Sequence, residues 1–130
     1  MGQAPKWVRR DAVLIFHDQQ IEEHGGPTGL LDPSKLESAL ARPENYWNYS
    51  DPQPDLAHLA AVYACGICQA HPFVDGNKRT AAVTAITFLL LNGRDFDPPE
   101  HELLAVMMSI AAGEMDEQEV TGWIRVHLSK

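Results

Sequence analysis

The residues best suited to chemistry lie together in one short stretch, His-Pro-Phe-Val-Asp-Gly-Asn-Lys-Arg at positions 71–79. The imidazole of His71 can accept a proton from a hydroxyl group near neutral pH. The carboxylate of Asp75 is a hard oxygen ligand, the type that Mg²⁺ uses where it also binds phosphates. Lys78 and Arg79 bring two positive charges to the same stretch. A proton acceptor, a metal ligand and an anion-binding pair are the parts that phosphoryl or nucleotidyl transfer requires.

The place of this motif (residues 71–79) in the expected fold favours anion binding. The motif leads into an apolar segment, residues 78–91, that we expect to form a helix. A helix start offers unpaired backbone N–H groups and the positive end of the helix dipole, and Gly76 would let a phosphate approach the backbone closely. Cations are unfavourable at a helix start alone, so a bound anion would explain Lys78 and Arg79.

Each of these residues also has a structural interpretation. A single histidine in a loop is more often a hydrogen-bonded structural residue than a catalytic one, and Asp75 or Asn77 can act as a helix N-cap. The two cations can belong to a solvated first turn. Phe73 is expected to anchor the loop under either interpretation. The functional interpretation is favoured because all of these residue types occur within nine positions.

Apolar residues at helical spacing predict an all-α protein around this motif. The helix ends are set by glycine, asparagine and Asp-Pro signals. The predicted helices cover residues 11–24, 33–41, 55–70, 78–91, 98–113 and 116–128. Residues 78–91 are apolar on nearly every side, so we place that helix at the centre of a bundle. The length of 130 residues predicts a single domain, residues 1–130.

Residues 43–54 are the exception to the helical pattern. The segment holds three prolines and the aromatic residues Tyr46, Trp47 and Tyr49. We expect Pro43 to end the preceding helix, leaving a short non-helical flap. The aromatic side chains can fold back onto the core, or the segment can form an exposed strand or hairpin that meets another polypeptide. The residues alone leave both interpretations open.

Composition and charge exclude several classes of protein. The chain carries 18 acidic and 10 basic side chains, a net charge of −8, and non-specific nucleic-acid binding needs a basic surface. No apolar run reaches the length of a membrane span, and the N-terminal residues show no secretory cleavage pattern. We therefore expect neither a nucleic-acid nor a membrane partner, and a cytoplasmic location.

The two cysteines, Cys65 and Cys68, have the spacing of a redox or zinc motif. Zinc needs four convergent ligands, and the one histidine that follows closely, His71, is better used by the motif. Two buried small residues of a core helix are the preferred interpretation. No functional role is assigned to His17, His101 or His127.

The motif resembles the signature of the Fic/Doc family, in the form found in Doc-like (death on curing) toxins. Eight of its nine positions are specified, so the signal is strong. The resemblance covers most of the chain: His24-Gly25-Gly26, the stretch from Gly29 to Pro43, and Arg79-Thr80-Ala81 entering an apolar helix that ends at Asn92-Gly93 are also typical of the family.

The resemblance implies roles for individual residues. His71 would be the general base for a target hydroxyl, and Asp75 would hold Mg²⁺. Gly76, Asn77, Lys78 and Arg79 would form the turn that binds the phosphates of ATP. The segment at residues 43–54 falls where the family places a flap that pairs with an extended part of its target, which makes Tyr46, Trp47 and Tyr49 candidate docking residues.

The resemblance also implies an activity. Most Fic proteins have glycine at the position of Lys78 and transfer AMP to a protein hydroxyl, whereas Doc-like members carry lysine there and act as protein kinases. The known Doc target is a threonine of elongation factor Tu, and the result is arrested translation. AMP transfer is the alternative here, and a catalytically silent binding module is a second one.

The resemblance further implies control by a partner. Fic proteins often carry a Ser/Thr-x-x-x-Glu helix whose glutamate points at the motif arginine. No Ser or Thr of this chain has Glu four residues later. Doc-like toxins are similar in lacking this brake and are neutralised by a separate antitoxin, Phd or a relative, so the expected partners are a protein substrate and an antitoxin.

Overall fold

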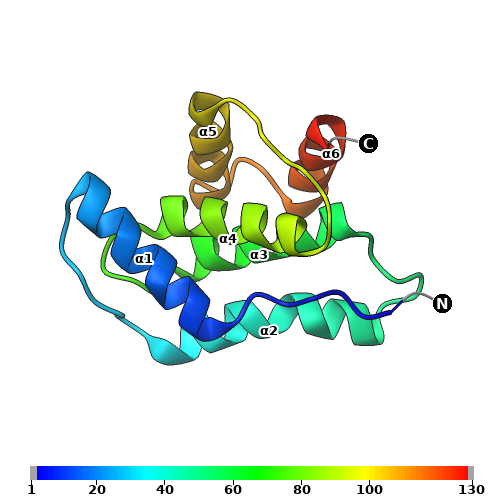
Figure 1. The fold of residues 1–130 in the computed structure, drawn as a ribbon, viewed down its shortest axis with the longest axis horizontal. Helices are drawn as coiled ribbons and strands as arrows, with labels where there is room; N and C mark the ends of the chain where they lie inside the picture. The colour runs from blue at the N-terminus through cyan, green and yellow to red at the C-terminus, as the bar shows by residue number, and fades with distance from the viewer. Residues whose placement is uncertain (1–2, 129–130) are drawn as a thin grey trace.

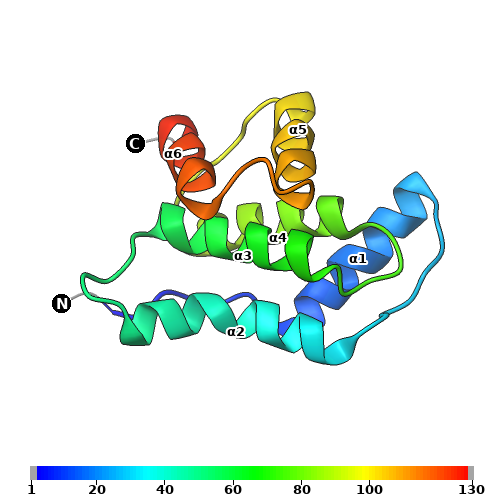
Figure 2. The same ribbon diagram turned by 180° about the vertical axis from the view of Figure 1, so that it is seen from behind.

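The computed structural model describes residues 3–128 and consists mainly of α-helices (Figure 1, Figure 2). The helices are α1 (Arg10–His24), α2 (Pro33–Tyr49), α3 (Leu56–Ala70), α4 (Asn77–Leu91), α5 (Glu100–Ala111) and α6 (Glu117–His127). Among the described residues, the strand-like pairings are two isolated β-bridges, Leu30 with Phe73 and Phe96 with Leu128. The predicted all-α fold is confirmed.

The centre of the bundle is α3. It packs against α2, α4, α5 and α6, and every residue from Leu59 to Cys68 is buried. Figure 1 shows α2 on one side of the α3–α4 pair and α5 with α6 on the other, while α1 crosses α4. Alanine, glycine and cysteine make up much of α3, and their small side chains let four helices approach it closely.

A buried central helix was expected, but its predicted position at residues 78–91 is wrong. That segment, α4, is indeed helical, yet its last residues reach the surface: Leu90 is 53% exposed and Leu91 is 44% exposed. The run of large apolar side chains near the end of α4 suggested the central position, but part of that run faces solvent. The contacts instead favour α3, because its small residues are compatible with neighbours on every side.

Helix α2 continues past Pro43 to Tyr49, so the prediction that Pro43 ends it and begins a non-helical flap is wrong. Proline removes the N–H that would bond to the carbonyl of Ala39 and crowds that carbonyl. Here Pro43 and Ala39 are buried, and Ala39 O would lie 3.4 Å from a Cβ added at Gly66 of α3. Packing against α3 therefore outweighs the local cost. The non-helical part is limited to residues 50–55.

Helix α5 begins two residues later than predicted: the sequence Asp97-Pro98 predicts Asp97 as the N-cap, whereas the N-cap is Pro99. Pro98 precedes a second proline, and a residue in that position is pushed toward extended conformations. The helix cannot start before Pro99 for that reason. The expected end at Gly113 is also slightly late, since the helix ends at Ala111.

Aspartate side chains cap three of the remaining helices. Asp32 accepts the N–H groups of Ser34 and Lys35, Asp55 accepts that of His58, and Asp116 forms a reciprocal capping box with Glu119. Each such cap typically stabilises a helix by about 1 kcal/mol. None of the helices within residues 3–128 is both long and apolar enough to cross a lipid bilayer.

Candidate functional site

The motif forms the connection between α3 and α4. His71 follows the last residue of α3 and has left-handed backbone angles, φ 52° and ψ 56°, while its N–H still bonds to the carbonyl of Ile67 at 3.0 Å. Among the described residues it is the one non-glycine residue with positive φ. Such a conformation costs free energy and is common at functional sites. It turns the chain sharply, so that the exposed His71 side chain lies beside the start of α4.

The side chain of Asn77 folds the motif back on itself. Its Oδ1 accepts the N–H of Phe73 at 3.0 Å, and its Nδ2 donates to the carbonyl of Phe73 at 2.9 Å. The ring of Phe73 is fully buried, and burying a side chain of this size contributes about 1.5–3 kcal/mol. The amide of Asn77 is therefore used by the loop, and only its backbone N–H remains at the helix start.

A second segment, the glycine-rich segment (residues 25–32), runs alongside the motif. Pro72 O accepts the N–H groups of Leu31 at 2.7 Å and Asp32 at 3.0 Å, and Gly29 O accepts the N–H of Val74 at 3.1 Å. Leu31 is 64% exposed and Val74 is 42% exposed. The segment adjacent to the motif is thus residues 25–32.

One oxygen of the Asp75 carboxylate is held by the turn. Its Oδ1 accepts the N–H of Gly76 at 2.8 Å. The other oxygen, Oδ2, lies so close to the Cα of Gly26 that a Cβ added there would be 2.5 Å away. The side chain is exposed, so its position is set by Gly76 and Gly26 while solutes can still reach it.

The start of α4 has the properties of an anion site. No side chain within residues 3–128 caps it, and the first bond of the helix runs from Thr80 N–H to Gly76 O at 3.0 Å. The N–H groups of the preceding turn have no acceptor within the helix. Lys78 is exposed and forms no ion pair with a described residue. Arg79 Nη1 lies 3.5 Å from His24 Nε2 and 3.6 Å from Glu100 Oε1.

Two cavities meet at the Asp75–Gly76 turn. A cavity of about 170 Å³ is lined by His71, Asp75, Gly76, Asn77, Lys78 and Arg79. A neighbouring cavity of about 280 Å³ is lined by Gln20, Ile21, His24, Gly25, Asp75, Gly76 and Arg79. The structure therefore brings together all six motif residues that were expected to act on nucleotide, metal or proton. The shared residues Asp75, Gly76 and Arg79 separate the two cavities.

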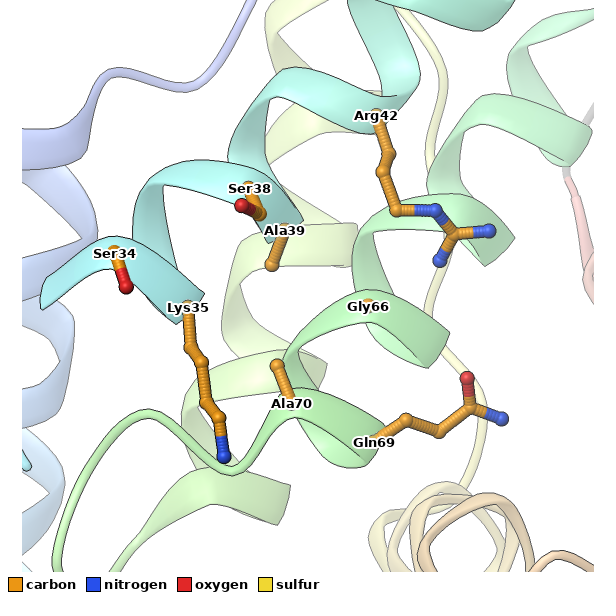
Figure 3. A pocket seen from close by; sticks show the side chains of 8 residues that line it. All are labelled: Ser34, Lys35, Ser38, Ala39, Arg42, Gly66, Gln69 and Ala70. Atoms are coloured by element: carbon orange, nitrogen blue, oxygen red, sulfur yellow. The ribbon is translucent and has the colours of Figure 1, made fainter. Parts of the chain in front are cut away.

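A larger cavity of about 370 Å³ lies between α2 and α3. Figure 3 shows Lys35, Arg42 and Gln69 around a floor formed by Ala39, Gly66 and Ala70. The guanidinium of Arg42 is bound to Glu117 at 2.7 Å. The lining holds no histidine or carboxylate, so this cavity offers neither a proton acceptor nor a metal ligand.

The three aromatic candidates of the expected flap do not join the motif. Tyr46 and Trp47 pack against the core as part of α2, and the ring of Tyr46 contacts His58 in the first turn of α3. His71 lies beyond the other end of α3, which is about 20 Å long at 15 residues. Tyr49 is 84% exposed at the end of α2. Tyr46 and Trp47 thus fold back on the core, which is the first of the two interpretations that the residues alone left open.

The cysteine pair is buried, in agreement with the prediction of two small residues in a core helix. Cys65 and Cys68 are free thiols and are 1% and 4% exposed. Burial raises the pKa of each thiol to about 12. Within residues 3–128, no group of three or more His, Cys, Asp or Glu side chains is arranged to hold a metal ion.

The site fits Mg²⁺ only in the company of phosphate. Asp75 is the one carboxylate lining the motif cavity, and Mg²⁺ is commonly bound by one or two carboxylates together with substrate phosphates and water. A magnesium nucleotide therefore matches the residues present better than the ion alone does.

Two residues of this region were given no functional role from the sequence. His17 is 2% exposed and contacts the motif through its Nε2, 2.8 Å from Asp75 O. His24 lines the second cavity beside Arg79. A polar residue in the apolar stripe formed by Val13 and Ile21 is the one local signal that sets His17 apart.

Comparisons with known proteins agree with this geometry. A model of the Fic/DOC family matches residues 7–89. A relative named "Protein kinase doc", from Escherichia phage P1, is 33% identical over 119 residues, which are 91% of this chain and 92% of the relative. "Toxin Doc" from Mycolicibacterium smegmatis is 38% identical over 96 residues, which are 71% of this chain and 72% of the relative. The protein therefore belongs to the Fic/DOC family.

Proposed function

We propose that this protein is a Doc-like toxin that transfers the γ-phosphoryl group of Mg-ATP to a serine or threonine hydroxyl of a protein. The observation that carries the proposal is the convergence of His71, Asp75, Lys78 and Arg79 around one cavity at an uncapped helix start. The names of the two relatives, a protein kinase and a toxin, support the same activity.

His71 would act as the general base. Its side chain is exposed at the cavity, and its ring has no hydrogen-bond partner among the described residues. The imidazole would take the proton from the target hydroxyl while the oxygen bonds to the γ-phosphorus. The bond from that phosphorus to the β–γ bridging oxygen breaks, and ADP leaves.

The charges at the start of α4 would orient the phosphates. The free N–H groups of the first turn, Lys78 and Arg79 all favour negative charge there. Asp75 would hold the magnesium ion, which supplies charge neutralisation when bound. Catalysis then depends on the geometry in which these groups hold the nucleotide, since only a phosphorus in line with the attacking oxygen reacts.

The glycine-rich segment would contact the protein target. It lies beside the motif, it exposes Leu31, and its backbone already pairs with Pro72 and Val74. An extended target segment could add to this short pairing and present a hydroxyl to His71. This assignment takes the place of the flap expected at residues 43–54.

By resemblance, the target would be elongation factor Tu, and its modification would arrest translation in the cytoplasm. The absence of a Ser/Thr-x-x-x-Glu sequence implies control by a separately encoded, Phd-like antitoxin. The purified protein should therefore be active alone and silenced by that partner.

The test uses ATP labelled separately on its α- and γ-phosphates, incubated with the purified protein and a bacterial translation extract. Transfer of the γ-label to a protein, with a mass increase of one phosphoryl group, supports the proposal. Transfer of the α-label identifies AMP transfer instead. If neither label is transferred by the parent protein under conditions where it arrests translation, the chain acts by binding alone.

A further inference from the structure

His17 has an unusual environment for a histidine of an amphipathic helix. It is 2% exposed, and among the described residues no other side chain of the Asp, Glu, Lys, Arg or His types is buried. Its neighbours one turn away on α1, Val13 and Ile21, are ordinary core residues. A buried polar ring in an apolar stripe requires a hydrogen-bond partner, and the partner lies in the motif.

Two motif residues contact this one side chain, and a third, Gly76, lies beside it. The Nε2 atom lies 2.8 Å from the backbone oxygen of Asp75. The imidazole stacks on the ring of Phe73, with ring centroids 3.8 Å apart and planes 7° from parallel. A Cβ added at Gly76 would lie 3.6 Å from Nε2. The stack fixes the plane of the imidazole, and the hydrogen bond fixes the height of the Asp75–Gly76 turn above α1.

The chemistry of the contact determines the tautomer. A backbone carbonyl only accepts hydrogen bonds, so Nε2 must carry a hydrogen and donate it to Asp75 O. The other nitrogen, Nδ1, is 4.0 Å from the nearest carboxylate oxygen, Oδ1 of the exposed Asp18, which is beyond hydrogen-bond distance. The Asp75 carboxylate accepts the N–H of Gly76. That N–H points to the opposite side of the peptide group from the Asp75 carbonyl that His17 contacts.

We propose that His17 is a positioning residue of the site: by holding the carbonyl of Asp75 it sets where the Asp75 carboxylate and the first N–H groups of α4 lie. The inference rests on the proposed function for its consequence, the binding of a magnesium nucleotide. A phenylalanine would fill the same space and stack on Phe73, but it would leave the carbonyl without a donor.

The test compares His17→Phe, which keeps a ring and loses the donor, with His17→Gln, which keeps an N–H donor at similar reach and loses the ring. Val13→Ala is the control, because it removes buried atoms from the same face of α1 one turn earlier. Outer residues that orient metal ligands typically change metal affinity by about 10–100-fold. Binding of Mg²⁺ with a non-hydrolysable ATP analogue should therefore weaken at least about 10-fold in His17→Phe, and less in His17→Gln and Val13→Ala.

A second measurement needs neither metal nor nucleotide. Nitrogen-15 NMR of the free protein should show the Nε2–H tautomer of His17 with slow hydrogen exchange, and His17→Phe should shift the amide signals of Gly76 and Lys78 more than Val13→Ala does. An Nδ1–H tautomer, or His17→Phe with parent-like amide signals and parent-like binding, would overturn the inference. If the parent binds no magnesium nucleotide, the proposed function fails, and the NMR result still decides whether His17 positions the turn. Should His17→Phe not fold, the amide signals and the nucleotide binding of His17→Gln are compared with those of Val13→Ala to decide whether His17 positions the turn.

Discussion

Gly26 and Asp75 are in direct contact across the site: a Cβ added at Gly26 would lie 2.5 Å from Oδ2 of Asp75. The contact is with the carboxylate that would hold magnesium, through the oxygen that does not accept the Gly76 N–H, so a larger residue must displace the carboxylate or the segment. We expect Gly26→Ala to weaken Mg²⁺-dependent nucleotide binding about 10-fold or more, the range found when metal ligands lose their orientation. Calorimetric titration with Mg²⁺ and an ATP analogue measures it.

Gly25→Ala is the matched control for this prediction. Gly25 and Gly26 both have positive φ, 80° and 113°, so alanine is strained at either position. A Cβ at Gly25, however, meets nothing within 4 Å. Equal losses of magnesium binding in the two variants would show that backbone strain, and not the contact with Asp75, is responsible.

His71 allows catalysis and stability to be separated. Asparagine tolerates the left-handed conformation well, whereas alanine in that conformation costs about 1–2 kcal/mol. We expect His71→Asn to fold about as stably as the parent and His71→Ala to be less stable by up to about 1 kcal/mol. Both should lose about 10²–10⁴-fold in phosphoryl transfer, the usual contribution of a general base.

Denaturant unfolding and rate measurements on the two His71 variants check both statements. If His71→Asn keeps a rate within threefold of the parent, His71 is not the base. If the rate of phosphoryl transfer instead falls in step with stability in both variants, His71 has a structural role.

The parts of this fold that follow from the sequence are those set by neighbouring residues. The Asp32-Pro33 signal predicts the start of α2 correctly because a cap acts over three residues, and the helix starts predicted at Asp55 and Asp116 are right to within one residue. The helical course through Pro43 depends on packing against α3, which no local rule contains. For the same reason the sequence did not assign a role to His17, whose contact with Asp75 joins residues 58 positions apart. The motif was identifiable because its residues are consecutive.

The buried cysteines should be chemically inert in the folded protein. Burial raises the pKa of the Cys65 and Cys68 thiols to about 12, and only the thiolate reacts readily. At pH 8 we expect no reaction with a thiol-specific dye in the native state and two reactive thiols after denaturation in urea. Fast native labelling, or release of zinc on denaturation, would restore the redox or metal interpretation.

Asp55 should contribute stability that depends on pH. Its carboxylate is partly desolvated, which raises its pKa, but the hydrogen bonds from Arg125 Nε at 2.9 Å and from His58 N–H outweigh this and hold the pKa below its ordinary value of 3.8. The folded state therefore binds the proton less readily than the unfolded state. The stabilisation is fully present above about pH 5 and is lost as the pH falls through the folded-state pKa.

Asp55→Asn tests this, because asparagine still caps α3 but carries no charge. Between pH 6 and pH 3 the melting temperature of the parent should fall further than that of Asp55→Asn. Glu37→Gln is the control, since the Glu37 carboxylate is 66% exposed and lies 4.0 Å from Arg10. Parallel curves for the parent and Asp55→Asn would show that the Arg125 pair contributes nothing to acid stability.

Lys78 separates phosphoryl transfer from AMP transfer. It lies in the first turn of α4, is exposed, and lines the same cavity as His71 and Asp75. A lysine here places a long side chain and a charge in the space beside the free N–H groups, where a pyrophosphate would otherwise bind. We expect Lys78→Gly to reduce transfer of the γ-label to protein at least about 10-fold and to permit transfer of the α-label, since the nucleotide reacts at whichever phosphorus is in line with the target oxygen.

Lys78→Met keeps the length and removes the charge, and it should lose γ-transfer without gaining α-transfer if the space is what excludes the other orientation. If Lys78→Gly and Lys78→Met both keep the parent's rate and label, Lys78 does not set the orientation of the nucleotide, and the assignment of kinase activity must rest on other residues of the site.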